Sequence, residues 1–362
     1  MTNIERRLRK LRVVLRKQKL DALVVSNEHN VRYLSGFTGD DSALLVSGEE
    51  SALVTDSRYT EQAEKEVCPH GVEVVERKKS VVETLGTLVR KRKLAGVGFE
   101  RYDATVNFHT RLSDSMKRAT LRPTERLVEG LRETKDASEV RAVRQAVHVA
   151  EEGLRATLPI IHPGVTEKDI AAELEYQMRK QGADASAFPI IVAGGERASL
   201  PHARPTERRI QAGEAVLIDW GARLEFYNSD LTRVLFLGTI PPKWRKRYEV
   251  VLRAQSAALR VIRKGVMTRT VDRAAREVFK RRRLARRFGH GLGHGVGLEV
   301  HEAPGLNRSS ESKLKPGMIF TVEPGIYFPD WGGIRVEDMV LIKRTGVEIL
   351  TQFEKQSDQV VI

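Results

Sequence analysis

Two acidic residues, Asp219 and Asp230, lie on the arms of a predicted β-hairpin. The segment AVLIDWGARLEFYNSDLTRVLF (215–236) reads as two apolar strands, and a turn at Leu224–Glu225 would place the two aspartates directly opposite each other. Opposed residues share one face of a sheet with Cβ atoms roughly 5 Å apart, where like charges are destabilising. The pair therefore predicts a cation between the carboxylates. The alternative is that one aspartate caps a turn or faces solvent.

A second pair of carboxylates lies near the C-terminus of the chain. Glu323 follows the apolar run MIFTV (318–322), Glu337 lies in GIRVED (333–338), and the turn-rich FPDWGG between them predicts a second hairpin. Arg335 and Glu337 are two residues apart, so they project from one face of a strand, and a buried arginine there would partner a carboxylate. Four acids in two hairpins are difficult to explain as surface residues.

Three histidines, His290, His294 and His301, fall within twelve residues of FGHGLGHGVGLEVHEAP (288–304). Glycine occupies alternate positions over 289–297, and in an extended segment this leaves one face open to close approach by backbone or ligand. A phosphate-binding loop is excluded because no lysine-serine or lysine-threonine pair follows, and no helix start is apparent after the glycines. We therefore expect at least one of these histidines to bind a metal ion.

The charges of this residue set favour two divalent ions over one. Four carboxylates balance the charge of two such ions, and a neutral imidazole adds a ligand without adding charge. Ligands rich in oxygen with one nitrogen favour manganese, cobalt or zinc over copper. A pair of ions about 3.5 to 4 Å apart lowers the pKa of a shared water and polarises a carbonyl. The motifs therefore predict a hydrolase that acts on amide bonds.

Helices and hairpins alternate in the part of the chain that contains these motifs, which favours an α+β domain. One predicted helix begins with Thr166 and Asp169 in capping-box spacing and stops at Gly182. The predicted helices span about 138–157, 166–181, 243–264 and 270–286.

The N-terminal part of the chain reads as a separate, smaller α/β domain. It opens with an amphipathic helix, continues with the apolar runs 21–25, 42–48 and 51–56, and has no dense cluster of acids and histidines. The chain then passes through Pro123 and Gly130 before a helical stretch. We place the boundary there, which gives domains 1–128 and 129–362.

Composition narrows the class of protein. The chain has 362 residues, 41% hydrophobic and 30% charged, which is typical of a folded globular protein. Cys68 is the only cysteine, so an intrachain disulfide is excluded, and the N-terminus has no apolar run of signal-peptide or membrane-span length. We expect a cytoplasmic protein with no membrane partner.

The net charge of +14 raises the question of nucleic-acid binding. Basic runs occur at Arg90–Lys93 and Lys280–Arg287, both in stretches with helical periodicity. No zinc-finger spacing, aromatic-interleaved RNA motif or helix-turn-helix accompanies them. The sequence therefore favours solvated helix faces, and no nucleic-acid partner is expected.

The motifs LIDWGA, NSDLTR, GHGLGHGVGLEVHEAP, TVEPGIYF and GIRVED resemble those of the pita-bread metallopeptidases, in the Xaa-Pro aminopeptidase and prolidase branch. In the N-terminal part, NVRYLSGFTG (30–39) and TDSRYTEQA (55–63) resemble strings of the creatinase-type N-terminal domain. The resemblance spans the chain and implies a pita-bread catalytic domain over 129–362, preceded by a creatinase-like domain over 1–128. It also implies a homodimer.

The resemblance assigns five metal ligands and a proton carrier. Asp230 and Glu337 would bridge two ions, and Glu323 would also carry a proton from water to the leaving proline nitrogen. Mn²⁺ is the expected metal, with Co²⁺ or Zn²⁺ as alternatives. The implied ligands are Asp219, Asp230, His294, Glu323 and Glu337.

Further positions match family residues outside the ligand set. His202 in SLPHARP would stabilise the tetrahedral intermediate, and His301 would contact substrate. Arg335 would brace the bridging carboxylates. His290 and Tyr327 fall at positions near the substrate.

The implied activity is hydrolysis of an Xaa-Pro bond at the N-terminus of a peptide. Many dipeptidases of the family have an arginine just after the HExP stretch that binds the free carboxylate of the substrate, whereas here HEAP is followed by Gly305. This departure favours an Xaa-Pro aminopeptidase, with an Xaa-Pro dipeptidase (prolidase) as the alternative. A methionine aminopeptidase is disfavoured because the creatinase-type domain and EPGIYF are present. A non-catalytic binding protein that kept its metal site is a more remote alternative.

Overall fold

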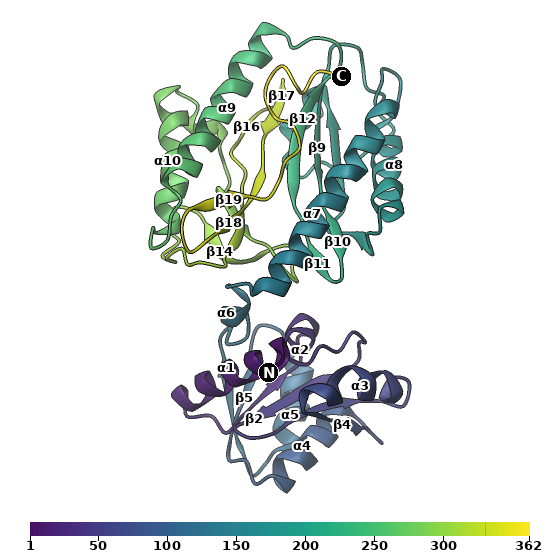
Figure 1. Cartoon of the computed structure of the whole chain (residues 1–362), viewed down its shortest axis with the longest axis vertical. Coiled ribbons are helices and arrows are strands. Elements are labelled where there is room, and N and C mark those ends of the chain that lie inside the picture. Colours follow the sequence, from purple (N-terminus) through teal and green to yellow (C-terminus); the bar gives the residue numbers. More distant parts are fainter. Residues whose placement is uncertain (330) are drawn as a thin grey trace. The chain divides into compact units, whose positions relative to one another are not determined.

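The computed structural model describes residues 1–329 and 331–362, and the chain divides into two compact units (Figure 1). The first unit is Met1–Arg132 and the second is Glu133–Ile362. The boundary expected from the sequence, between residues 128 and 129, lies four residues before this division. Within the described ranges, no helix is both long enough and apolar enough to cross a membrane.

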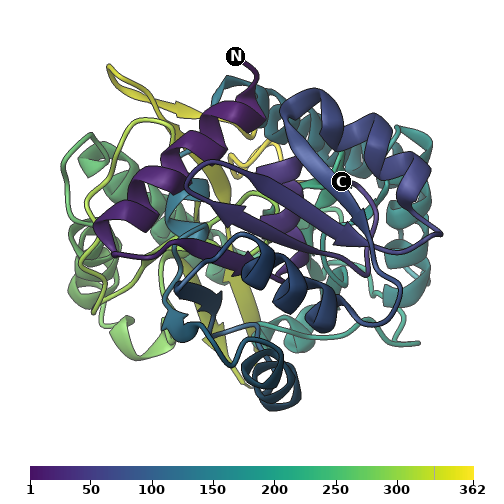
Figure 2. The ribbon, with the colours of Figure 1, turned by 90° about the horizontal axis from the view of Figure 1, so that it is seen from below.

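The first unit is built on a six-stranded mixed sheet in the order β4-β3-β2-β1-β5-β6. The β1–β2 and β2–β3 pairs are antiparallel, and the other three pairs are parallel. In Figure 2 the purple and blue helices of this unit lie around its sheet. The predicted α/β pattern is confirmed. The helices are α1 (Asn3–Lys17), α2 (Glu28–Ser35), α3 (Thr60–Val67), η1 (Cys68–His70), α4 (Val81–Lys91), α5 (Val106–Ser115) and α6 (Glu129–Arg132), and the strands are β1 (Ala22–Val25), β2 (Ala43–Ser47), β3 (Ser51–Thr55), β4 (Val72–Glu76), β5 (Gly96–Glu100) and β6 (Thr120–Thr124).

A buried carboxylate, Glu100, ends β5 in this unit. Its Oε2 accepts hydrogen bonds from the backbone N–H groups of Ser26 (2.7 Å) and Asn27 (2.8 Å), and its Oε1 accepts one from the side-chain amide of Asn30 (2.7 Å). Burial raises the pKa of Glu100 to about 7 in spite of these hydrogen bonds, and the charge of Glu129 adds to the rise.

We expect the stability of the first unit to fall as pH rises from about 4.5 to 7. In that range the folded state holds a proton on Glu100 that the unfolded state has released, so the loss amounts to at most about 3 kcal/mol. Urea unfolding followed by far-UV circular dichroism at pH 5 and pH 8 would measure it. Tryptophan fluorescence recorded in parallel identifies the transition of the second unit, because Trp220, Trp244 and Trp331 all lie there.

Glu100→Gln should remove this pH dependence, and Glu64→Gln, at an exposed position, should keep it. Identical pH profiles for wild type and Glu100→Gln would contradict the prediction.

The second unit has two helix pairs with strands between them. Figure 1 shows α7 and α8 on one side, α9 and α10 on the other, and β9, β12, β16 and β17 between the pairs. Its sheets have the orders β12-β9-β8, β14-β13-β15-β18-β19, β11-β10-β7 and β16-β17. The predicted α+β class is confirmed. The helices are α7 (Ala137–Thr157), η2 (Leu158–Ile160), α8 (Glu167–Lys180), η3 (Gly195–Ser199), α9 (Pro242–Val261), α10 (Thr268–Arg281) and η4 (Ala285–Arg287), and the strands are β7 (Ala185–Ser186), β8 (Ile191–Gly194), β9 (Ala215–Trp220), β10 (Ala222–Leu224), β11 (Tyr227–Asn228), β12 (Leu231–Phe236), β13 (Gly293–Gly295), β14 (Glu302–Leu306), β15 (Ile319–Val322), β16 (Gly325–Phe328), β17 (Gly332–Arg335), β18 (Asp338–Ile342) and β19 (Val347–Ile349).

The four predicted helices of this unit are confirmed, with different ends. Thr166 and Asp169 form the predicted capping box at the start of α8. The last helix, α10, ends at Arg281 instead of near residue 286, and Arg283 has the left-handed φ of 58°. The backbone N–H groups of Arg283 and Leu284 donate to the carbonyls of Lys280 and Phe279, which ends the helix in a Schellman cap.

Candidate metal centre

The first carboxylate hairpin has a different register from the predicted one. Asp219 on β9 pairs with Thr232 on β12, so the predicted direct pairing of Asp219 with Asp230 is wrong. The cause is the turn, which lies one residue later than expected, at Glu225 and Phe226, with left-handed φ values of 48° and 68°. The two carboxylates still lie close enough for the charge of Asp219 to raise the pKa of Asp230.

The second carboxylate hairpin is confirmed. The β15–β18 and β16–β17 ladders follow one register, in which Glu323 falls opposite Glu337 in the gap between the ladders. Both residues therefore lie where the hydrogen-bonded pairing of the strands is interrupted. Asp330, in the predicted turn FPDWGG, lies outside the described residues.

Glycines place β13 against its neighbours. A Cβ atom at Gly293 would lie 2.1 Å from the carbonyl oxygen of Thr321, and one at Gly295 would lie 2.2 Å from that of Ala303. Only glycine allows the backbones to approach so closely. The close approach predicted from the alternating glycines is confirmed at these positions, and it holds His294, between them, against the carboxylates.

The imidazole of His294 faces two carboxylates with an unprotonated nitrogen. Its Nδ1 lies 3.1 Å from the carbonyl of Gly295 and therefore carries the hydrogen, which leaves a lone pair on Nε2. Nε2 lies 3.5 Å from an oxygen of Asp230 and 3.5 Å from one of Glu323. Burial lowers the pKa of His294 to about 4, so the ring is neutral at neutral pH. A lone pair that faces carboxylates is repulsive unless a cation lies between them.

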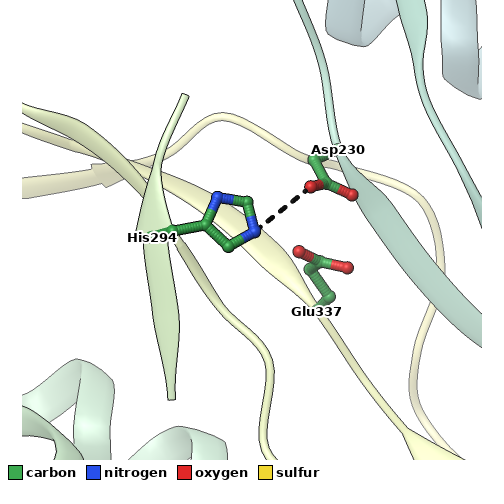
Figure 3. Close-up of side chains that lie close together, drawn as sticks. All are labelled: Asp230, His294 and Glu337. Atoms are coloured by element: carbon green, nitrogen blue, oxygen red, sulfur yellow. Dashed lines mark ion pairs between the residues drawn. The ribbon is translucent and has the colours of Figure 1, made fainter. Parts of the chain in front are cut away.

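Three of these groups could bind one ion directly. Asp230, His294 and Glu337 each offer a ligand atom, and these atoms lie within 4.8 Å of one another (Figure 3). Burial raises the pKa of Asp230 and of Glu337 well above the usual range, and the neighbouring carboxylates raise both further. Burial likewise raises the pKa of Glu323 to about 8. Without a counter-charge, these groups would hold protons instead of remaining ionised.

Arg335 binds one oxygen of the Asp219 carboxylate, and Thr232 binds one oxygen of the Glu337 carboxylate. Arg335 donates from Nη2 to Oδ2 of Asp219 (2.5 Å) and from Nε to the hydroxyl of Thr232 (3.0 Å). The Thr232 hydroxyl in turn donates to Oε2 of Glu337 (2.6 Å). The remaining oxygens, Oδ1 of Asp219 and Oε1 of Glu337, are buried and accept no hydrogen bond from the described residues. A buried carboxylate oxygen without a partner is costly, and a metal ion would satisfy it.

Tyr327 and His290 support Arg335 from its other side. Arg335 donates from Nη1 to the Tyr327 hydroxyl (2.8 Å), which lies 3.0 Å from Nε2 of His290. Nδ1 of His290 lies 2.7 Å from the carbonyl of Gly291 and carries the hydrogen, so Nε2 accepts from the tyrosine. Both residues thus lie at the site, and in the structure they contact Arg335.

The carboxylates line a cavity of about 730 Å³. His202 and His301 are exposed side chains in its wall, as are the cations Lys168 and Arg204, which the sequence reasoning did not identify. All predicted site residues line this cavity except Tyr327, which lies behind Arg335 and His290. An apolar part of the wall consists of Ala171, Phe188, Pro189, Ile190, Ile191 and Val300.

Two families account for almost the whole chain. Residues 141–344 match the model of metallopeptidase family M24, and residues 7–134 match the creatinase/prolidase N-terminal domain. The chain belongs to metallopeptidase family M24. The predicted architecture of a creatinase-type domain followed by a pita-bread domain is confirmed.

Relatives of this M24 chain include both kinds of Xaa-Pro peptidase. The structure of an Xaa-Pro dipeptidase from Bacillus anthracis matches with a TM-score of 0.96 and 36% identity, over 99% of this chain and 100% of that chain. The structure of an X-Pro aminopeptidase from Thermotoga maritima matches with a TM-score of 0.89 and 36% identity, over 95% and 98%. The Xaa-Pro dipeptidase of Pyrococcus furiosus is 34% identical over 98% of this chain and 99% of its own.

The site of this M24 chain fits a divalent metal. Its donors are carboxylates and one neutral imidazole, and two of the carboxylate oxygens are buried without a hydrogen-bond partner among the described residues. Such oxygen-rich donor sets suit manganese, cobalt and zinc.

Proposed function

We propose that this metallopeptidase is an Xaa-Pro dipeptidase, which hydrolyses the bond between the first residue and a following proline. The observation that carries the proposal is the convergence of four carboxylates and the unprotonated Nε2 of His294 on one cavity. The apolar part of the wall offers a surface for the pyrrolidine ring.

Two Mn²⁺ ions are proposed at the site, with Co²⁺ or Zn²⁺ as alternatives. When bound, the ions would polarise the scissile carbonyl and lower the pKa of a water molecule. The proposed ligands include Asp219 and Glu337, each of which has a buried carboxylate oxygen without a hydrogen-bond partner among the described residues. The ligands would be Asp219, Asp230, His294, Glu323 and Glu337.

Glu323 is proposed to move the proton that the reaction requires. It would accept a proton from the water that attacks the carbonyl carbon, and it would deliver that proton to the proline nitrogen as the C–N bond breaks. The Thr321 hydroxyl lies 3.3 Å from Oε1 of Glu323 and donates to it, which orients the carboxylate. His202 is proposed to stabilise the tetrahedral intermediate, and His301 to contact substrate, because both lie in the cavity wall.

We propose a dipeptide substrate, whereas the glycine that follows HEAP, Gly305, favoured an aminopeptidase that acts on longer peptides. That preference assumed that the free carboxylate of a dipeptide is bound by an arginine just after HEAP. Arg204 offers a cation from another loop of the cavity, two residues after His202, and its guanidinium has no hydrogen bond or ion pair with the described residues. Lys168 is less available because it pairs with Glu207 at 2.7 Å. The relatives named as Xaa-Pro dipeptidases also favour this choice.

Arg204→Gln should raise the KM for Gly-Pro by about tenfold or more, because a hydrogen bond to a charged group contributes about 1.5 to 3 kcal/mol. We expect kcat to change less than KM, since the carboxylate takes no part in the making or breaking of bonds. Steady-state kinetics on Gly-Pro and on Gly-Pro amide would test this. The amide lacks the carboxylate and should be insensitive to the substitution.

Arg273→Gln, on the exposed face of α10, is the matched control and should leave both substrates unaffected. An equal rise in KM for Gly-Pro and for its amide would show that Arg204 does not bind the substrate carboxylate.

An Xaa-Pro aminopeptidase is the second candidate, favoured by Gly305 and by the similarity to the Thermotoga maritima enzyme. Rates on Gly-Pro, Arg-Pro-Pro and Met-Ala-Ser with Mn²⁺ supplied would separate the candidates. Preference for Gly-Pro supports the proposal, and preference for Arg-Pro-Pro supports the aminopeptidase. No cleavage of any peptide would favour a binding protein, and activity that survives metal removal would exclude the metal mechanism. The cytoplasmic location and the homodimer expected from the sequence stay part of the proposal.

A further inference from the structure

The whole net charge of the chain comes from one segment. Residues 242–287, which form α9, α10 and η4, hold 17 of the 62 lysine and arginine residues but only three of the 48 acidic ones. The other 316 residues hold 45 basic and 45 acidic residues. General richness in arginine therefore does not explain the charge of +14, because the basic residues elsewhere are balanced.

The other helix pair of the same unit has the opposite character. Residues 137–180, which form α7, η2 and α8, hold six basic and seven acidic residues. Figure 1 shows the two pairs on opposite sides of the strands. An outer helix pair in this fold therefore does not need a basic surface for its stability.

The cations of residues 242–287, here called the α9–η4 face, are mostly exposed and unneutralised. Fifteen of the 17 are exposed, and within the described part of the chain only three are in an ion pair: Arg253 with Glu249, Arg269 with Glu311, and Arg276 with Asp272. Such a density of like charge opposes folding, so a counter-charge from outside the chain would stabilise it.

Aromatic rings position some of these cations without neutralising them. The guanidinium of Arg247 lies 4.0 Å from the ring centroids of both Phe328 and Trp331. Lys243 lies 5.6 Å from Trp331, and Arg287 lies 4.9 Å from Phe328. Contacts of this kind hold a cation over a ring while leaving its charge available to an anion.

The residue types on the α9–η4 face indicate which kind of polyanion it would bind. None of the large apolar side chains in residues 242–287, all of which the structure describes, is exposed. The segment itself therefore offers no exposed apolar group to insert into a lipid layer, and the neighbouring rings of Phe328 and Trp331 already hold Arg247 in place of an unpaired base. Thirteen of the 17 cations are arginines, which bind phosphate oxygens in a bidentate manner. The 20-residue α9 is about 30 Å long, a distance along which duplex DNA carries close to 18 phosphates.

We propose that the α9–η4 face binds the phosphate backbone of double-stranded DNA without sequence specificity. By sequence alone, the basic runs were expected to be solvated helix faces. Their concentration on one helix pair, while the other pair of the same unit is balanced, is the observation that favours a partner.

The test measures fluorescence anisotropy of a labelled 25-base-pair duplex of mixed sequence with the full-length protein, over a series of NaCl concentrations. We expect a dissociation constant in the micromolar range near 100 mM salt, with a steep dependence on salt. Replacement of four exposed, unpaired cations by glutamine should weaken binding at least about tenfold and reduce the slope of log K against log salt by about 3 to 4. The four are Lys280, Arg281, Arg282 and Arg286.

A matched variant removes the same charge elsewhere. Glutamine at four exposed lysines of the first unit lowers the net charge to the same +10, and we expect it to weaken binding by less than about threefold. Both variants should retain wild-type activity on Gly-Pro, which shows that they are folded. The control positions are Lys78, Lys79, Lys91 and Lys117.

Three outcomes would overturn the proposal. The first is no binding of the duplex at 100 mM salt. The second is equal weakening by both variants, which would indicate net charge alone. The third is tighter binding of a single strand of equal length, or of phosphatidylglycerol vesicles, than of the duplex.

Discussion

Replacement of Glu323 by glutamine is expected to reduce kcat for Xaa-Pro substrates by at least about 10²-fold, the lower range for loss of a general acid–base. Glutamine has nearly the shape of glutamate and keeps one carbonyl oxygen as a ligand, but it cannot accept a proton from water. Because the proton must reach the proline nitrogen before the amine can leave, the substitution should affect kcat far more than KM.

Metal content distinguishes loss of the proton carrier from loss of a ligand. The manganese bound per chain should be measured by atomic emission for wild type and Glu323→Gln after the same dialysis. Glu277→Gln, at an exposed position of α10, is the control and should keep full activity. Retention of more than about a tenth of the wild-type kcat by a metal-loaded Glu323→Gln would refute the assigned role.

Local patterns predicted the carboxylate hairpins to different degrees. The segment that contains Glu323 and Glu337 has strong turn signals and clear apolar strands, and the predicted hairpin with one carboxylate on each arm is confirmed. The segment that contains Asp219 and Asp230 turns at Glu225 and Phe226, which are not usual residues for left-handed φ values. No propensity rule identifies such a turn. The cation expected between Asp219 and Asp230 nevertheless agrees with the geometry, because burial and mutual repulsion do not depend on direct pairing.

Residues that support the site were harder to predict than its acids. Thr232 links Arg335 to Glu337, and the only signal for it was its position two residues after Asp230, at the start of the following strand. Arg204 joins the cavity through the loop that precedes β9, outside the strands and the histidine segment that hold the predicted ligands. Such placements depend on tertiary packing, which periodicity within one segment does not contain.

A second buried arginine, Arg233, fastens the C-terminal segment to the strands of the metal site. Its guanidinium pairs with Asp338 (2.9 Å), and both side chains are almost fully buried. It also donates to the carbonyl oxygens of Phe353 (2.8 Å), Glu354 (3.1 Å) and Glu337. Because Glu337 is a proposed ligand and Phe353 belongs to the C-terminal segment, one side chain joins the site to the end of the chain.

Arg233→Met should lower the free energy of unfolding of the second unit by about 2 to 4 kcal/mol, because it leaves several buried carbonyls without their donor and leaves the Asp338 carboxylate with only Lys355 and Thr351 as partners. Arg155→Met is the matched control. Arg155 also holds the C-terminal segment, through Glu354 at 2.8 Å, but both side chains are more than a third exposed, so its loss should cost less than about 1 kcal/mol. Urea unfolding followed by tryptophan fluorescence reports on this unit alone, since it contains all three tryptophans. Comparable losses of unfolding free energy in the two variants would mean that burial does not determine how much Arg233 stabilises the unit. A large loss for Arg233→Met alone would identify the burial of a paired charge, and not the number of contacts to the C-terminal segment, as the source of stability around the metal centre.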